Sequence, residues 1–276
     1  MATSAGHGAK ALAGRPLGTP CRRTDMCNAP SLDVSRIRRS QRVIVEASEG
    51  GYGGLVTPEA AIAPAHVELL GLLAQGSLSA FAHTANASSA AWTTEERLDL
   101  ARIAAQRFSH LGRLEAELSA RGAGLVQAME PFGAPSDDFG AHTRSAQWPE
   151  MLVKNCIIGG LASDFADAVR PSLPSELAEI LMGSLDDGDL AGRPAEMLAG
   201  VLAKEPDLQG RLALHGRRLL GEALSQVQRV AAGHPELTGL ITGVHDDSGD
   251  DLAAISQLMA DLATSHSRRM ESLGLA

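Results

Sequence analysis

Two short segments of the chain carry candidate metal ligands at helical spacing. Arg107-Phe-Ser-His110 places an imidazole three residues after a basic side chain, and Asp186-Asp-Gly-Asp189 places two carboxylates three residues apart. Residues at this spacing share one face of a helix. In a bundle of long helices, Glu-x-x-His pairs on two helices and single glutamates on two others converge to hold a pair of metal ions. The chain contains no intact Glu-x-x-His, so His110, Asp186 and Asp189 form an incomplete set of candidate metal ligands.

Each candidate ligand also has a structural interpretation. His110 fits a core or helix-capping histidine, because Glu115 and Glu117 are expected on the solvated side of its helix. The acidic segment 186–189 could chelate a hard cation through oxygen ligands. Its short spacing, and the absence of the glutamate that ends a calcium loop, favour an acidic turn instead.

Other polar residues allow a structural and a functional interpretation side by side. Glu222, Gln226 and Arg229 recur every three or four residues, so they could form a polar ladder that holds helices in register, or part of an active site. Asp164 lies near Gly159-Gly160, whose missing side chains would let another helix approach or leave a small cavity. The chain has no Gly-x-Ser-x-Gly turn, Walker loop or dinucleotide fingerprint, so its sequence favours neither nucleophilic catalysis nor nucleotide binding.

Long helices are the elements that would position these residues. Apolar residues recur at intervals of three and four behind N-cap and proline signals, as expected for amphipathic helices. The predicted helices cover residues 59–86, which Pro64 could break, then 94–121, 148–170, 175–203, 207–232 and 250–273. Gly188, Gly192 and Pro194 should interrupt the fourth of these, and the Gly-, Pro- and Asp-rich segment through residues 131–138 is predicted to be a loop. With no strand signal between the helices, we expect an all-α, antiparallel bundle of about six helices over residues 57–276.

Charge divides the chain into two parts. Residues 1–55 hold eight Lys or Arg and four acidic residues, whereas the remainder holds 16 basic and 29 acidic residues. We expect residues 1–56 to form a disordered basic arm, which could be a targeting segment, an interaction arm or an unstructured extension. The acidic body is a poor candidate for binding nucleic acid, because that affinity depends on Lys and Arg displacing counterions.

Amino-acid composition limits the fold class and the cellular compartment that we expect. Aromatic residues make up only 3% of the chain, which argues against an all-β protein. No apolar stretch reaches the roughly 18–20 residues that span a bilayer, so no membrane association is expected. The three cysteines are few and odd in number, so a disulfide framework is not expected. This favours a reducing compartment, and we expect a cytoplasmic protein.

Several stretches of the chain together resemble a known family. They are residues 66–81, Leu161-Ala-Ser-Asp-Phe165, residues 210–230 with the most specific piece Gly221-Glu-Ala-Leu-Ser-Gln226, and Thr264-Ser-His-Ser-Arg-Arg-Met270. In these the chain resembles bacterial ferritin-like fold proteins grouped with tRNA hydroxylases that act on methylthio-isopentenyl-adenosine. The resemblance covers nearly all of residues 57–276. It implies a six-helix ferritin-like bundle and, in the hydroxylases themselves, a non-haem di-iron centre that activates oxygen.

The resemblance also implies where metal ligands would stand, and most of these positions are substituted. The implied carboxylate and imidazole positions fall on Ser77, Arg107, His110, Gly159, Asp186 and Asp189, of which only His110 and Asp186 keep a matching type. Two irons need several carboxylates to balance their charge, and an arginine beside them would be repulsive.

Two hypotheses about function follow from these substitutions. In the first, the protein is degenerate and non-catalytic, binds no cofactor, and acts as a binding or structural helical protein with a protein partner or as a homodimer through an apolar helix face. In the second, it is a non-haem di-iron, oxygen-dependent hydroxylase in which His110, Asp186 and Asp189 hold iron. The sequence identifies no catalytic residue and no substrate.

Overall fold

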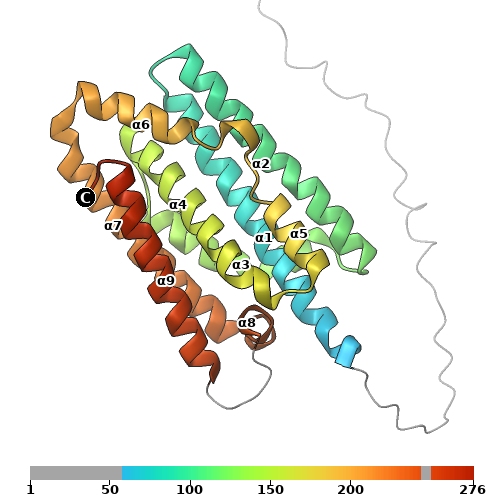
Figure 1. Ribbon diagram of the computed structural model, residues 1–276. Coiled ribbons are helices and arrows are strands. Elements are labelled where there is room, and N and C mark those ends of the chain that lie inside the picture. Colours follow the sequence, from blue (N-terminus) through green and yellow to red (C-terminus); the bar gives the residue numbers. More distant parts are fainter. Residues whose placement is uncertain (1–57, 244–249) are drawn as a thin grey trace, which may run out of the picture. The chain divides into compact units, whose positions relative to one another are not determined.

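All regular secondary structure in the described part of the chain is helical. The computed structural model describes residues 58–243 and 250–276, with side chains described over 64–243 and 252–276. Nine α-helices and three short 3-10 helices are found in these ranges (Figure 1). They are α1 (Pro58–Ala90), α2 (Thr94–Ala120), α3 (Leu125–His142), α4 (Trp148–Val169), η2 (Arg170–Ser172), α5 (Ser175–Gly183), η3 (Gly188–Leu190), α6 (Arg193–Lys204), η4 (Pro206–Leu208), α7 (Gln209–Gly233), α8 (Pro235–Thr242) and α9 (Asp250–Ser272). The predicted all-α bundle is confirmed, whereas the predicted arm over residues 1–56 lies outside the described residues.

Helix α2 begins where its sequence signals place it. The Thr93 hydroxyl accepts a hydrogen bond from the Glu96 amide at 3.2 Å, and the Glu96 carboxylate accepts one from the Thr93 amide at 2.9 Å. This capping box satisfies two backbone donors at the helix start. The helix ends before Gly122, which adopts a positive φ of 73° that an L side chain would disfavour.

The structure corrects the number and extent of the helices. The segment predicted as a loop through residues 131–138 is part of α3, although Pro131 and Pro135 lie inside that helix. Ala128 and Phe132 are buried on one face of α3, and this packing outweighs the loss of two backbone donors. Helix α1 runs through Pro64 without a break, and α8 was not predicted. The interruption expected at Gly188, Gly192 and Pro194 is present, because α5 ends at Gly183 and α6 begins at Arg193.

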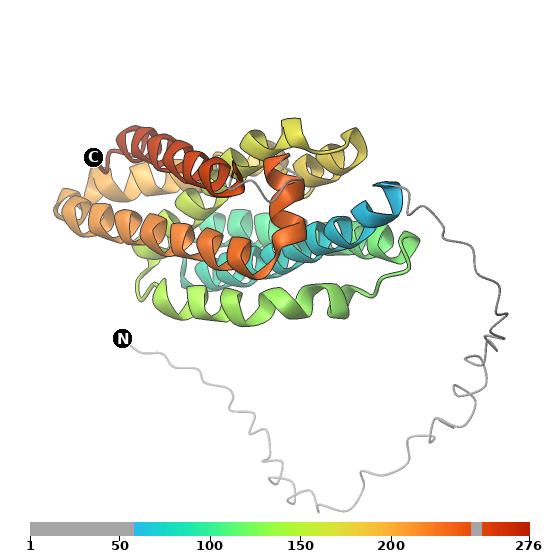
Figure 2. The same ribbon diagram turned by 90° about the horizontal axis from the view of Figure 1, so that it is seen from below.

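Two helices form the centre of the bundle. Helix α1 packs against α2, α3, α4 and α8, and α4 packs against α6, α7 and α9 (Figures 1 and 2). The residues buried between them form one apolar cluster, which includes Leu69, Leu70, Leu152 and Ile157 at 0% exposure. A site between α1 and α4 is therefore enclosed by the whole bundle.

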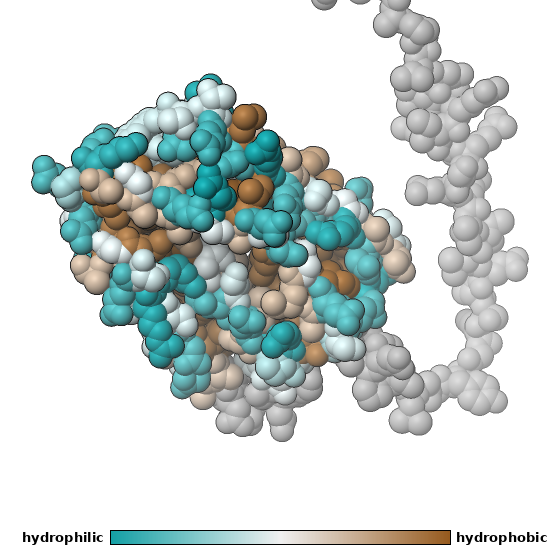
Figure 3. All heavy atoms as spheres, turned by 45° about the horizontal axis from the view of Figure 1, so that its top comes forward, coloured by the Kyte–Doolittle hydropathy of each residue, from teal (hydrophilic) through white to brown (hydrophobic). Residues whose placement is uncertain are grey.

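The surface is mixed in character. Figure 3 shows one face, on which hydrophilic side chains predominate and apolar side chains are visible between them. The large exposed apolar side chains include Trp92, Leu98 and Phe108, and the Phe108 ring lies 5.2 Å from that of Phe81. A homodimer through an apolar helix face stays a prediction. None of the helices, within the residues described, has the length and hydropathy needed to cross a membrane.

The crossing of α1 and α3 depends on a glycine, which gives a first prediction. A Cβ at Gly71 would lie 2.7 Å from the carbonyl carbon of Ala128, and backbone atoms cannot yield as a flexible side chain does. We expect Gly71→Ala to lower the free energy of unfolding by about 1–3 kcal/mol, measured by urea denaturation. Gly76→Ala on the same helix is the control, because a Cβ there meets no atom within 4 Å. It should leave stability unchanged or raise it by up to about 1 kcal/mol, and equal effects of both variants would contradict the close approach.

Candidate functional site

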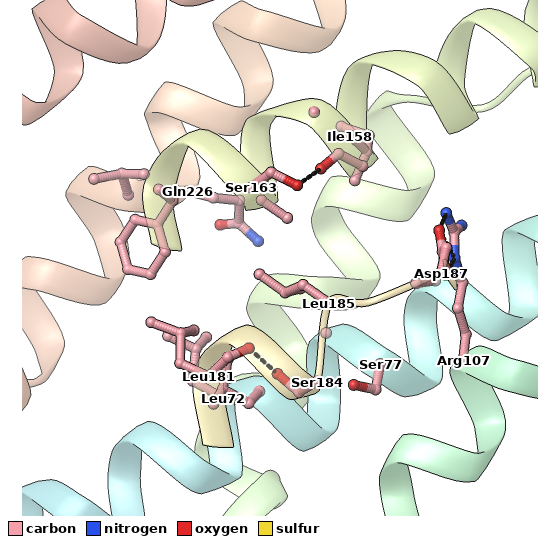
Figure 4. Close-up of a pocket in the computed structure, with 18 of the residues that line it drawn as sticks. Leu72, Ser77, Arg107, Ile158, Ser163, Leu181, Ser184, Leu185, Asp187 and Gln226 are labelled. Atoms are coloured by element: carbon pink, nitrogen blue, oxygen red, sulfur yellow. Dashed lines mark hydrogen bonds and ion pairs between the residues drawn. The ribbon is translucent and has the colours of Figure 1, made fainter. Parts of the chain in front are cut away.

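A cavity of about 610 Å³ lies inside the bundle, lined by residues from all of the long helices except α3 (Figure 4). Most of its lining is apolar, including Leu72 from α1, Ile158 from α4 and Leu181 from α5. Figure 4 shows Arg107 and Asp187 facing one another on one side of this cavity, and Gln226 on the opposite side of the view. The cavity thus has an apolar body with a few polar groups, as small-molecule sites do.

The structure brings together some of the positions that the resemblance marks for metal ligands, and leaves others apart. Ser77, Arg107, His110 and Gly159 all line the cavity. Asp186 and Asp189 are exposed and do not line it, whereas Asp187 between them does. Within residues 58–243 and 250–276, no group of three or more His, Cys, Asp and Glu could hold a metal ion. His110, Asp186 and Asp189 therefore do not form one ligand cluster.

The Asp186 side chain stabilises a turn. Its carboxylate accepts a hydrogen bond from the Gly188 amide at 2.8 Å, which shapes the turn before η3. Its backbone carbonyl accepts one from the side chain of Gln106 at 2.8 Å, which ties the turn to α2. The acidic segment is an acidic turn, as one of the two interpretations predicted.

The buried guanidinium of Arg107 organises the polar side of the cavity. Arg107 is only 8% exposed, and its Nη2 lies 2.5 Å from Asp187 Oδ2 while its Nε donates to Oδ1 at 3.1 Å. Its Nη1 donates to Thr84 Oγ1 at 2.7 Å and to Asn155 Oδ1 at 3.1 Å. One side chain thereby connects α1, α2, α4 and the segment between α5 and η3.

This arrangement does not fit a pair of metal ions. The guanidinium is a fixed positive charge, and Asp187, the one carboxylate paired with it among the described residues, is occupied by it. A Cβ at Gly159 would lie 3.7 Å from Arg107 Nη2, so the guanidinium stands close to where a ligand side chain from that position would begin. Ser77 and Gly159 supply no carboxylate to balance metal charge.

His110 is a buried, neutral histidine. It is 1% exposed, and burial lowers the pKa of its imidazole, an effect that a backbone hydrogen bond with Ser184 opposes. In the part of the chain that the structure describes, its Nε2 has no hydrogen-bond partner. The position is that of a core histidine beside the cavity, which is one of the two interpretations its sequence allowed.

Two further titratable groups of the lining are held uncharged by their surroundings. Burial lowers the pKa of His83 to about 3, and the charges of Arg107 and Lys154 add to this effect. Burial raises the pKa of Cys156 to about 12, so its thiol is not a nucleophile near neutral pH. Neither residue was singled out from the sequence, because neither has a local motif around it.

Gln226, a member of the expected ladder, lines the cavity, but the ladder is incomplete. The side chain of Gln226 accepts a hydrogen bond from Arg229 at 2.8 Å and donates one to the Pro135 carbonyl, which links α7 to α3. Among the described residues, no hydrogen bond connects Glu222 to either partner. The bond from Gln226 to Pro135 joins two helices, and the bond from Arg229 to Gln226 lies within α7, which fits the structural interpretation.

The glycine pair on α4 has two separate uses. Gly160 makes room for the guanidinium of Arg269 from α9, whose Nη2 lies 2.7 Å from Asp164 on α4. Gly159 opens instead toward the cavity and Arg107. Both possibilities foreseen for the pair, the approach of another helix and a cavity, are thus realised side by side.

Comparison with known protein families gives a match to a ferritin-like domain. A family model described as a ferritin-like domain of actinomycetes matches residues 61–244. No curated protein matches the chain.

The ion pair at the cavity supports a prediction about stability. Arg107→Met leaves the Asp187 carboxylate, whose side chain is only 14% exposed, without its counter-charge, so we expect the free energy of unfolding to fall by about 3 kcal/mol in urea denaturation. Glu176→Gln is the control, because it removes an ion pair with Arg121 in which the Glu176 side chain is 72% exposed, and it should change stability by less than about 0.5 kcal/mol. Adding Asp187→Leu to Arg107→Met should recover part of the loss. Similar effects of Arg107→Met and Glu176→Gln would contradict a buried, coupled pair.

The neutral histidines support a prediction about pH. Because the pKa of His83 falls from 6.5 to about 3 on folding, the unfolded chain binds more protons than the folded one between these values. The free energy of unfolding should therefore be fully maintained above pH 6.5 and fall as the pH drops below it. Urea denaturation of His83→Gln between pH 6 and 4 should show a slope shallower by up to about 1.4 kcal/mol per pH unit than that of the parent protein. An unchanged slope would show that His83 does not titrate differently in the two states.

Proposed function

The chain belongs to the family of actinomycete ferritin-like domains, and we propose that it uses this fold to bind a small apolar molecule in its central cavity, without a metal centre and without catalysis. The observation that carries the proposal is the Arg107–Asp187 ion pair, which stands among the positions that the resemblance marks for metal ligands. Kinship with the tRNA hydroxylase-like proteins is part of the proposal and rests on the sequence stretches described above.

The chemistry of the lining supports a binding function over oxygen chemistry. A di-iron centre needs several carboxylates, and among the described residues the lining offers Asp187 alone, which is already paired with the buried Arg107. Of the metal-ligand positions that the resemblance implies, those in the described lining are Ser77, Arg107, His110 and Gly159, and among these His110 alone has a side chain that could bind iron. One neutral imidazole beside a guanidinium is a weak attraction for Fe²⁺.

The volume and polarity of the cavity support an apolar ligand. Protein interiors are usually packed with few voids larger than a water molecule, and ligand sites have volumes of roughly 300–1,000 Å³. The cavity, at about 610 Å³, falls in that range, and its charged side chains Arg107 and Arg269 are each paired with an aspartate. A ligand in it would therefore contact mostly hydrocarbon, with Ser77 and Gln226 available to orient it.

Metal content tests the non-catalytic half of the proposal. We expect protein purified without chelator and incubated anaerobically with Fe²⁺ to contain no stoichiometric iron by elemental analysis, before and after His110→Ala. About two irons per chain, lost in His110→Ala, would overturn the proposal and support the alternative, a di-iron hydroxylase.

Probe binding tests the other half. A neutral, solvent-sensitive fluorophore such as Nile red should bind with one site per chain. Gly76→Phe should abolish this binding, because Gly76 lines the cavity and a Cβ there meets no atom within 4 Å, so the ring can enter open space. Gly112→Phe is the matched control, since Gly112 has equal space and does not line the cavity. Equal binding by both variants would show that the probe does not occupy this cavity.

A further inference from the structure

A second cavity of about 800 Å³ adjoins the first, and α3 contributes to its lining together with α1, α4 and α7. The two cavities share wall residues, among them Gly76, Ala80, His83, Ile158, Ala162 and Val227. Apart from His83 and Gln226, the described residues that line both cavities carry no polar side chain. The two cavities therefore lie next to one another along residues of α1, α4 and α7.

Two basic side chains at the second cavity have no acidic partner. Lys154 and Arg144 both line it, and among the described residues neither lies within 4.0 Å of a carboxylate oxygen. Lys154 is half-buried, and its Nζ donates to the Thr143 carbonyl at 3.2 Å and to the Thr143 hydroxyl at 2.9 Å. The Nζ atom also lies 5.6 Å from the centroid of the Phe139 ring, so the ammonium group meets an aromatic face and two oxygens of Thr143, and no carboxylate among the described residues. A partly desolvated cation without a counter-charge favours an anionic ligand.

The other charged residues around the two cavities leave Lys154 and Arg144 as the place where an anionic group would bind. Arg107 and Arg269 at the first cavity are each paired with an aspartate. At the second cavity, Asp137 is the one acidic residue of the described lining, and it is exposed and forms no ion pair there. Burial lowers the pKa of Lys154. Burial also lowers the pKa of His83 in the shared wall, and the charges of Arg107 and Lys154 add to this effect.

From this juxtaposition we infer that the two cavities together bind one free, unbranched long-chain monocarboxylic acid. Its carboxylate lies at Lys154 and Arg144, and its hydrocarbon chain extends along the shared wall into the first cavity. The inference rests on the proposed function, because it needs the first cavity to accept an apolar molecule. To the proposed function it adds the chemical class of the ligand and the orientation of the ligand in the two cavities.

Displacement of Nile red by saturated fatty acids and by their methyl esters, each kept below the concentration at which micelles form, tests the inference. For the acids, we expect the affinity to rise about fourfold with each added methylene until the cavities are full. At equal chain length the acid should bind about tenfold or more tightly than the ester, because only the acid carries a charge for Lys154 and Arg144.

Variants of Lys154 separate the head-group contact from the rest. Lys154→Met keeps most of the side-chain stem and should weaken acid binding about tenfold, while ester binding, which also reports correct folding, stays unchanged. Lys204→Met is the matched control, because Lys204 is exposed and lines neither cavity, and it should change neither. Arg144→Met should weaken acid binding in the same direction.

The outcomes distinguish this inference from the proposed function. If the parent protein binds acid and ester equally, or Lys154→Met leaves acid binding unchanged, the inference is wrong, Lys154 serves only to cap the end of α3, and the apolar site stands. If Nile red does not bind at all, the proposed function fails, and the inference fails with it.

Discussion

The burial of one guanidinium group is the constraint on which the centre of this bundle depends. A guanidinium has five donors and a permanent charge, and removing it from water is costly unless acceptors and a counter-charge surround it. Here Thr84 comes from α1, Asn155 from α4 and Asp187 from the segment between α5 and η3. Three parts of the chain that are far apart in sequence must therefore meet at α2. The position of Asp187 also closes one side of the cavity, so fold and site share this single requirement.

The helices could be predicted wherever local signals and tertiary packing agree. The start of α2 follows from Thr93 and Glu96 alone, because a capping box is a local interaction. Helix α3 could not be predicted, because two prolines argue against a helix locally, and only contacts with the rest of the bundle favour one. Burial of Phe132 against distant parts of the chain is information that periodicity within the segment does not contain.

The candidate site was predictable in part, for a related reason. His110, Arg107 and Ser77 lie on long helices, whose regular geometry lets a sequence position be converted to a face. The aspartates at 186–189 lie between helices, where that conversion fails. Gly188 has a positive φ of 57°, and the Gly188 amide engages the carboxylate of Asp186, so the turn directs Asp187 inward. A helical spacing of three, applied to this segment, selects Asp186 and Asp189 and misses the residue that pairs with Arg107.

The open space in the bundle follows from side-chain size on its two central helices. Only 3% of the chain is aromatic, and glycine or alanine stands at several cavity-facing positions of α1 and α4, including Gly76, Gly159 and Ala162. Leu181 and Leu237 of the lining are 0% exposed, so the space lies beside well-packed core residues. Gly160 shows the contrast, because the guanidinium of Arg269 fills the room that its missing side chain leaves. Where small residues meet no such neighbour, the interior stays open. Because Arg107 and Arg269 are paired with aspartates, Lys154 and Arg144 are the cations at the cavities without a carboxylate partner among the described residues, and they would determine which end of a ligand lies beside them.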